Sequence, residues 1–137
     1  CTPLLVSSFM QTPAPLVAVL DDEPEMLKAI RRLLASRGFR VDTYERGADL
    51  LTAFESSPRP DCLVLDLHMP EMSGFDVLEA LRIRQISVPV IVITGHDEPG
   101  MEQRSRSLGA ISYFKKPVDR DDLLSAIEAA RSIAGGE

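Results

Sequence analysis

The sequence is short of cysteine, of positive charge and of long apolar runs, and each shortage excludes a class of protein. It contains two cysteines, Cys1 and Cys62, so a disulfide framework is not expected. The net charge of −6 argues against binding to nucleic acid, which rests on Lys and Arg. No apolar run reaches about 18 residues, so no membrane span is expected. These shortages favour a cytoplasmic protein that binds neither nucleic acid nor membrane directly.

The composition is that of one globular domain preceded by an atypical segment. Hydrophobic residues make up 45% and charged residues 26% of the 137 residues, which is ordinary for a folded domain. Residues 1–14 carry no charge and lack the basic start of a signal peptide. We expect them to be poorly ordered; Met10 is a candidate start, with the residues before it coming from a tag or an alternative upstream start. The domain is predicted over residues 15–134, with a tail at residues 135–137.

Five short apolar segments predict β-strands. Residues 16–20, 62–65 and 88–93 are continuous apolar runs, which is typical of strands buried on both faces of a parallel sheet. Residues 39–44 and 111–114 are weaker signals and are expected nearer the edges of the sheet. A sheet with three central strands and two outer strands is therefore predicted.

An amphipathic segment follows each predicted strand. Four of these segments carry a clear apolar stripe at helical spacing, whereas residues 96–110 offer only Met101 and Leu108, so that helix should be loosely held. Strand and helix thus alternate five times. This order predicts an α/β fold, (βα)5, with a five-stranded parallel sheet and helices on both faces. The four stronger helices are expected after Pro24 and over residues 47–57, 73–84 and 119–133.

Polar side chains follow the carboxyl ends of the predicted strands, where ligands bind in an open parallel α/β sheet. Acids follow the first and third strands, a threonine follows the fourth and lysines follow the fifth. Because these strand ends share one edge of the sheet, we expect the side chains to converge there. The residues concerned are Asp21, Asp22, Glu23, Asp66, Thr94, Lys115 and Lys116.

This set of groups suits phosphoryl chemistry. Clustered carboxylates repel one another unless a cation lies among them, and oxygen ligands favour a hard ion such as Mg²⁺. A carboxylate can also act as a nucleophile and form an aspartyl phosphate, while a lysine and a hydroxyl group position the phosphoryl group and neutralise its charge. Since neighbouring strand residues face opposite sides, only one of Lys115 and Lys116 is expected to point into the site.

Four motifs lie at these strand ends. They are VLDDE (Val19 to Glu23), VLDLHMPEMSG (Val64 to Gly74), VIVITGH (Val90 to His96) and GAISYFKKPV (Gly109 to Val118). Together they resemble the motifs of the receiver domain of two-component response regulators, and the resemblance extends over residues 15–133. The second and third motifs are especially similar to the FixJ-like subgroup. The resemblance implies the flavodoxin-like fold of receiver domains.

The resemblance also implies a phosphoacceptor and a metal site. Asp66 would accept the phosphoryl group. Asp21 and Asp22 would hold Mg²⁺ together with Asp66, and the main-chain carbonyl of His68 would be a further ligand. Mg²⁺ is therefore the expected cofactor.

A signalling switch, rather than an enzyme, is what the resemblance implies. A sensor histidine kinase or a histidine phosphotransfer protein would supply the phosphoryl group, and Lys116 and Thr94 would contact it. Thr94 would move inward and the aromatic Tyr113 would change rotamer, which would alter the face of the fourth helix, fifth strand and fifth helix. That face is also the candidate interface of a phosphorylation-dependent homodimer. The domain would catalyse only its own phosphorylation and dephosphorylation.

Simpler interpretations exist for the same residues. Asp66 could be a turn or N-cap acid, Glu23 a solvated acid at a helix N-terminus, and Thr94 part of a strand-to-loop turn. Two histidines alone are weak evidence for zinc, so His68 and His96 are interpreted as exposed loop residues. The main alternative function is a small Mg²⁺-dependent phosphohydrolase with an aspartyl nucleophile, although the D-x-D spacing of such enzymes is absent. A flavin mononucleotide carrier would need Gly, Ser or Thr after the first strand, where this chain has acids.

Overall fold

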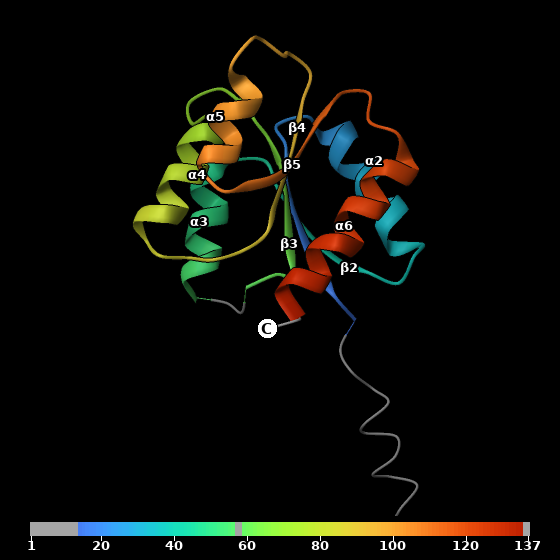
Figure 1. The fold of residues 1–137 in the computed structure, drawn as a ribbon. Helices are drawn as coiled ribbons and strands as arrows, with labels where there is room; N and C mark the ends of the chain where they lie inside the picture. The colour runs from blue at the N-terminus through green and yellow to red at the C-terminus, as the bar shows by residue number, and fades with distance from the viewer. Residues whose placement is uncertain (1–13, 57–58, 136–137) are drawn as a thin grey trace, which may run out of the picture.

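The computed structural model describes residues 14–56 and 59–135, in which every strand is followed by one helix (Figure 1). The predictions of a poorly ordered N-terminal segment and of a tail concern residues that lie almost entirely outside these ranges. The strands are β1 (Leu16–Leu20), β2 (Arg40–Tyr44), β3 (Cys62–Asp66), β4 (Val90–Thr94) and β5 (Ala110–Lys115). The helices are α2 (Pro24–Ala35), α3 (Gly47–Ser56), α4 (Gly74–Ile83), α5 (Met101–Ser107) and α6 (Arg120–Gly135).

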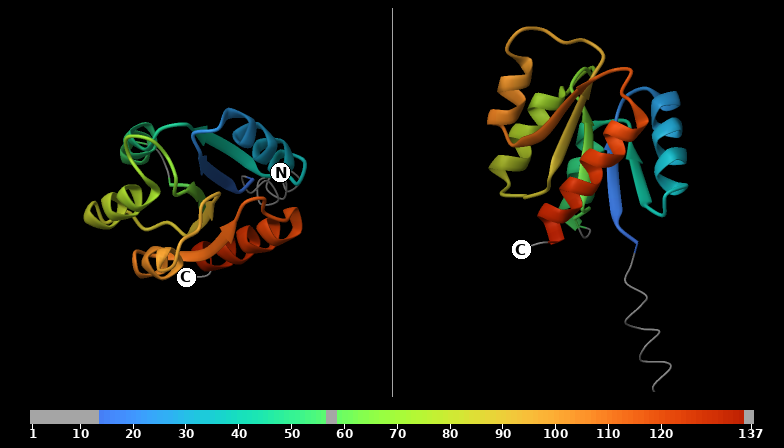
Figure 2. Two further views of the ribbon diagram at one scale, coloured as in Figure 1. Left: turned by 90° about the horizontal axis from the view of Figure 1, so that it is seen from above. Right: turned by 45° about the vertical axis from the view of Figure 1, so that its right-hand side comes forward.

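The strands form one parallel sheet in the order β2-β1-β3-β4-β5. Helices α3, α4 and α5 cover one face of the sheet, and α2 and α6 cover the other (Figures 1 and 2). The predicted (βα)5 fold is confirmed, with the two weaker strands at the edges. The order also makes β1, β3 and β4 direct neighbours, so their carboxyl ends lie side by side.

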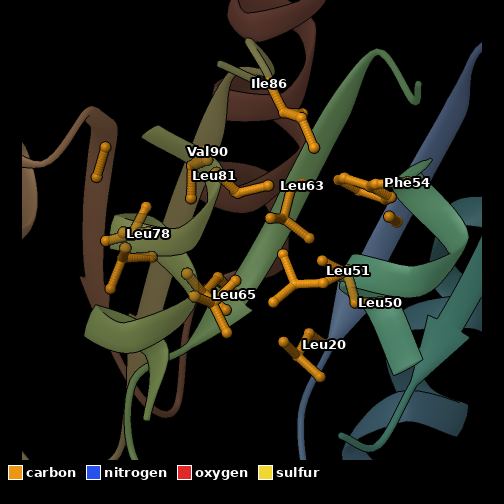
Figure 3. Packing of buried hydrophobic residues seen from close by; sticks show 14 of the residues in the cluster. Leu20, Leu50, Leu51, Phe54, Leu63, Leu65, Leu78, Leu81, Ile86 and Val90 are labelled. Carbon is orange, nitrogen blue, oxygen red and sulfur yellow. The ribbon is translucent and has the colours of Figure 1, made fainter. Parts of the chain in front are cut away.

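Two hydrophobic cores, one on each face, hold this arrangement. All five residues of β3 and of β4 are buried, as expected for continuous apolar strands. On one face, leucines of β1 and β3 pack against the apolar stripes of α3 and α4 (Figure 3). On the other, valines of β1 and isoleucines of β4 pack against α2 and α6. The central strands are thus fixed from both sides, which gives the residues at their ends defined positions.

Local signals explain where several elements begin and end. Helix α4 starts at the N-cap residue Ser73, which forms a capping box with Asp76. Strand β4 starts at Val90 rather than at the predicted Val88, because Pro89 has no N–H to donate to the sheet. Helix α5 is the shortest helix and has a single buried residue, Ser105, consistent with its thin apolar stripe.

Candidate functional site

Two neighbouring strands bring carboxylates together at one edge of the sheet. Asp66 is the last residue of β3, and Asp21 directly follows β1, which pairs with β3. Asp66 is 2% exposed and Asp21 is 0% exposed. Carboxylate oxygens of Asp21, Asp22 and Asp66 lie within 4.8 Å of one another. The acids that the sequence analysis singled out therefore form one compact group, which we call the acidic cluster.

Backbone N–H groups hold two of these carboxylates in place. The N–H of His68 donates to Asp66 Oδ1 at 3.2 Å, and the N–H of Glu23 donates to Asp21 Oδ1 at 2.9 Å. Because each donor lies two residues after its acceptor, the turn that follows each strand fixes the orientation of the carboxylate. The second oxygen of each acid remains directed toward the site.

Glycine at position 74 lets helix α4 start directly against the end of β3. The N–H of Gly74 donates to the carbonyl oxygen of Leu67 at 3.0 Å. A Cβ atom at this position would lie 2.7 Å from the carbonyl oxygen of Asp66 and 2.7 Å from Cα of Leu67. Both of these are backbone atoms that cannot turn away. The Gly of the VLDLHMPEMSG motif thus allows the start of α4 to pack closely against the backbone of Asp66 and Leu67.

Lys116 supplies the cation of the site from the far side of β4. Its N–H donates to the carbonyl oxygen of Thr94 at 2.7 Å, and its side chain passes close to Gly95. The Nζ atom lies 2.9 Å from Asp21 Oδ2 and 3.7 Å from Asp66 Oδ2. Lys115, by contrast, is largely exposed and lies 3.9 Å from Asp97. The structure therefore decides which of the two lysines enters the site.

Burial and neighbouring charges perturb the titration of Asp66 and of Lys116. Burial, followed by the negative charge of Asp21, raises the pKa of Asp66 to about 6, although the His68 N–H and Lys116 act in the opposite direction. Burial lowers the pKa of Lys116, but its hydrogen bonds to Asp21 and Glu23 outweigh that effect and leave the pKa raised. The lysine is therefore protonated at neutral pH, and one positive charge lies among several carboxylates.

The donor set of the cluster fits a magnesium ion. Oxygens of three carboxylates lie within 4.8 Å of one another, and the pKa of Asp66 is raised first by burial and then by repulsion from Asp21, which an added cation would relieve. Carboxylate oxygens are hard ligands, and Mg²⁺ is commonly held by one or two of them together with water and phosphate. Asp21, Asp22 and Asp66 are therefore suited to this ion.

A cleft of about 280 Å³ opens over the cluster. At its mouth the rings of His68 and His96 lie with their centroids 5.1 Å apart, and His96 Nε2 lies 2.7 Å from Glu98 Oε2. Both histidines are exposed, as predicted, and their proximity follows only from the tertiary structure. The cleft is lined by Asp22, Glu23, Asp66, His68, Gly95, His96 and Lys116.

Thr94 and Tyr113, the predicted switch residues, make contacts away from the acidic cluster. The Thr94 side chain is buried, and its hydroxyl donates to the carbonyl oxygen of His96 at 3.0 Å and accepts from the His96 N–H at 3.1 Å. The half-buried Tyr113 donates its hydroxyl hydrogen to Asp97 Oδ1. Burial, followed by this hydrogen bond, raises the pKa of Tyr113. Both side chains are thus engaged with the loop between β4 and α5.

The contact that the sequence analysis missed is the one made by Glu23. We expected this acid to be a solvated group at the start of a helix, and it does lie at the N-cap of α2 with its side chain 62% exposed. However, its Oε1 atom also accepts a hydrogen bond from Lys116 Nζ at 3.0 Å. The two residues are far apart in the sequence, and no local pattern signals their pairing.

The fold and the acidic cluster place the chain among the doubly wound α/β proteins whose site lies at the carboxyl ends of the strands. Residues 17–128 match the sequence model of the response regulator receiver domain. The chain therefore belongs to the response regulator receiver domain family. Receiver domains of this family partner with histidine kinases. No helix within residues 14–56 and 59–135 is long and apolar enough to cross a membrane.

Curated relatives agree with this family assignment, and a solved structure agrees with the fold. The transcriptional regulatory protein KdpE of Mycobacterium tuberculosis is 40% identical over 124 residues, which are 89% of this chain and 54% of KdpE. FixJ of Rhizobium meliloti, which represents the predicted subgroup, is 36% identical over 114 residues, 83% of this chain and 55% of FixJ. A CheY-like receiver domain protein from Methanospirillum hungatei matches the fold with a TM-score of 0.84 at 22% identity, covering 90% of this chain and 98% of that one. The chain spans about half the length of the curated relatives.

Proposed function

We propose that this chain is a phosphorelay switch in which Asp66 accepts a phosphoryl group from a histidine kinase or a histidine phosphotransfer protein. The observation that carries the proposal is the setting of Asp66. The carboxylate ends a fully buried strand, lines the cleft, and lies 3.7 Å from the ammonium group of Lys116. A nucleophile held in this way needs little reorganisation to meet an incoming phosphoryl group.

The transfer exchanges one bond for another. Asp66 Oδ2 attacks the phosphorus atom, the bond from phosphorus to the donor's imidazole nitrogen breaks, and its electron pair remains on that nitrogen. The His68 N–H holds Oδ1 during this step, so that Oδ2 is left free to react. With a pKa of about 6, Asp66 is still mainly ionised at neutral pH and is more basic than an ordinary aspartate. Lys116 neutralises part of the charge that the phosphoryl group brings.

Asp21, Asp22, Asp66 and the main-chain carbonyl of His68 would hold Mg²⁺. When bound, the ion neutralises phosphoryl oxygens and orients them for displacement. The Oδ1 atom of Asp21 already accepts a hydrogen bond from the N–H of Glu23, which leaves Oδ2 to contact Lys116 and the ion. The protein contributes a rigid set of oxygen ligands and a cleft that admits the donor.

The response to phosphorylation would run through Thr94 and Tyr113. The Thr94 hydroxyl would leave the His96 backbone and donate to the phosphoryl group, and Tyr113 would leave Asp97 and turn inward. These changes would alter the face formed by α5, β5 and α6, which is also the proposed interface of a phosphorylation-dependent homodimer. The short helix α5, with one buried residue, is suited to such a movement.

We further propose that the chain is a cytoplasmic signalling domain and not an enzyme acting on other substrates. The net charge of −6 favours partners other than nucleic acid. The pair Asp21-Asp22 lacks the D-x-D spacing of aspartyl phosphohydrolases, which makes turnover of phosphate esters the weaker hypothesis. Only phosphorylation and dephosphorylation of Asp66 itself would be catalysed.

Beryllofluoride, a phosphoryl mimic, provides the test. With Mg²⁺ present, it should perturb the amide NMR signals of the cleft and of the loop after β4 in the intact chain. Asp66→Asn should abolish the response, whereas Asp42→Asn, which alters an exposed acid on the edge strand β2, should preserve it. An Asp66→Asn variant that responds like the intact chain would refute the proposal.

A further inference from the structure

Glu23 lies at the N-cap of α2, but its side chain does not cap that helix. An N-cap oxygen ordinarily accepts a hydrogen bond from a backbone N–H in the first turn, and Glu23 makes no such bond. Its Oε1 atom accepts instead from Lys116 Nζ at 3.0 Å. The carboxylate is therefore directed across the cleft, away from the helix that it begins.

This contact determines where the ammonium group of Lys116 lies. A lysine ammonium has three N–H donors. One is used by Asp21 at 2.9 Å and a second by Glu23 at 3.0 Å, whereas Asp66 Oδ2 lies at 3.7 Å, beyond hydrogen-bond distance. The Lys116 side chain is only 16% exposed, so its position is set by these partners more than by water. Its charge is thus held on the side of Asp21 and Glu23.

We propose that Glu23 is a positioning residue that holds Lys116 away from Asp66 in the unmodified chain and competes for its ammonium group with a phosphoryl group on Asp66. The inference rests on the proposed function and concerns the regulation of the same site. A phosphoryl group brings about two negative charges and strong acceptor oxygens close to Lys116. Glu23, being 62% exposed, can release the lysine and be solvated by water. The strength of the contact between Glu23 and Lys116 then sets how readily Asp66 holds a phosphoryl group.

The substitution Glu23→Gln tests the competition because it removes the charge and keeps the shape. At saturating Mg²⁺, we expect beryllofluoride to bind the Glu23→Gln chain about threefold more tightly than the intact chain, the size expected for a partly exposed ion pair. The matched control is Glu25→Gln, which makes the same change two residues further on. Glu25 is 88% exposed and lies 3.8 Å from Lys28, so its substitution should leave the affinity unchanged.

A double-mutant cycle separates a contact with Lys116 from a general effect of charge. In a Lys116→Met background, where binding is weaker, Glu23→Gln should no longer raise the affinity. Weaker binding by Glu23→Gln in the intact background, an equal change in Glu25→Gln, or a gain that persists without the lysine would each overturn the inference. These results differ from failure of the proposed function, in which the response to beryllofluoride would not depend on Asp66 at all.

Discussion

The two halves of the site are built differently, although both lie at the carboxyl ends of the same sheet. On the β1–β3 side, Asp21 and Asp66 are almost fully buried, each accepts a hydrogen bond from a backbone N–H group, and Asp21 also accepts one from Lys116. On the β4–β5 side, Thr94 and Lys116 are also largely buried, but the loop between β4 and α5 is held mostly by exposed side chains, as in the pairs His96–Glu98 and Lys115–Asp97. Exposed pairs contribute little to stability, whereas buried groups held by several partners are difficult to displace.

This difference separates a fixed half of the site from a half that can change. In the fixed half, both faces of β3 are packed against helices, so Asp66 at the end of this strand has a defined position. The other half adjoins α5, which has one buried residue and therefore few contacts to lose. Under the proposed function, a phosphoryl group accepted at Asp66 on the fixed side would change the contacts of the other side.

The largest expected effect on stability comes from adding a methyl group at a glycine on each side of the site. Gly74→Ala would put a Cβ atom 2.7 Å from backbone atoms of Asp66 and Leu67, so it should destabilise the fold by about 3 kcal/mol. Gly95→Ala would place its Cβ 3.6 Å from Cδ of Lys116, an ordinary contact, and should change stability by less than about 0.5 kcal/mol. Urea unfolding of both variants measures the contrast, and equal losses would show that the two sides are equally rigid.

The next effect depends on pH and is specific to the acidic cluster. The pKa of Asp66 is raised from 3.8 to about 6 in the folded chain, so the folded state binds more protons than the unfolded state between these values. Stability should therefore fall as pH rises through this window. Asp66→Asn, which keeps an acceptor for the His68 N–H, should be more stable than the intact chain by roughly 2–3 kcal/mol at pH 7, and nearly equal to it at pH 4.

Magnesium provides the control for this prediction. Because a cation in the cluster relieves the repulsion among the acids, added Mg²⁺ should stabilise the intact chain at pH 7 and have less effect on Asp66→Asn. Urea unfolding at each pH, with and without Mg²⁺, gives both comparisons. A difference between the two chains that did not change with pH would contradict the assignment of the raised pKa to Asp66.

The smallest effect is expected on the β4–β5 side. Tyr113→Phe removes the hydrogen bond to Asp97 and should cost less than about 1 kcal/mol, because the acceptor can be solvated. Its consequence should be local: amide hydrogen exchange should quicken over residues 95–100 and stay unchanged over residues 62–66. Faster exchange in β3 would mean that the two halves are coupled more tightly than their contacts indicate.

Much of the fold could be predicted from the sequence because its signals are local. Continuous apolar runs indicate buried strands at any position in a chain, so β1, β3 and β4 were identified to within a few residues. The acids of the cluster could likewise be predicted, since parallel strands present their carboxyl ends at one edge. The contact between Glu23 and Lys116 could not, because the two residues lie 93 positions apart and are joined only by the packing of the sheet.

The sequence by itself determined the alternation of strands and helices and the identity of the polar residues that end the strands. Tertiary structure alone decided that β1 lies beside β3, which makes Asp21 a neighbour of Asp66. It also decided that Lys116 bonds to Asp21 and Glu23 and lies farther from Asp66, and that the Thr94 hydroxyl bonds to the His96 backbone. The physical reason is that hydrophobic periodicity is a property of neighbouring residues in the sequence. The partner of a polar side chain, by contrast, depends on which strands and loops the folded chain brings within about 3 Å of it.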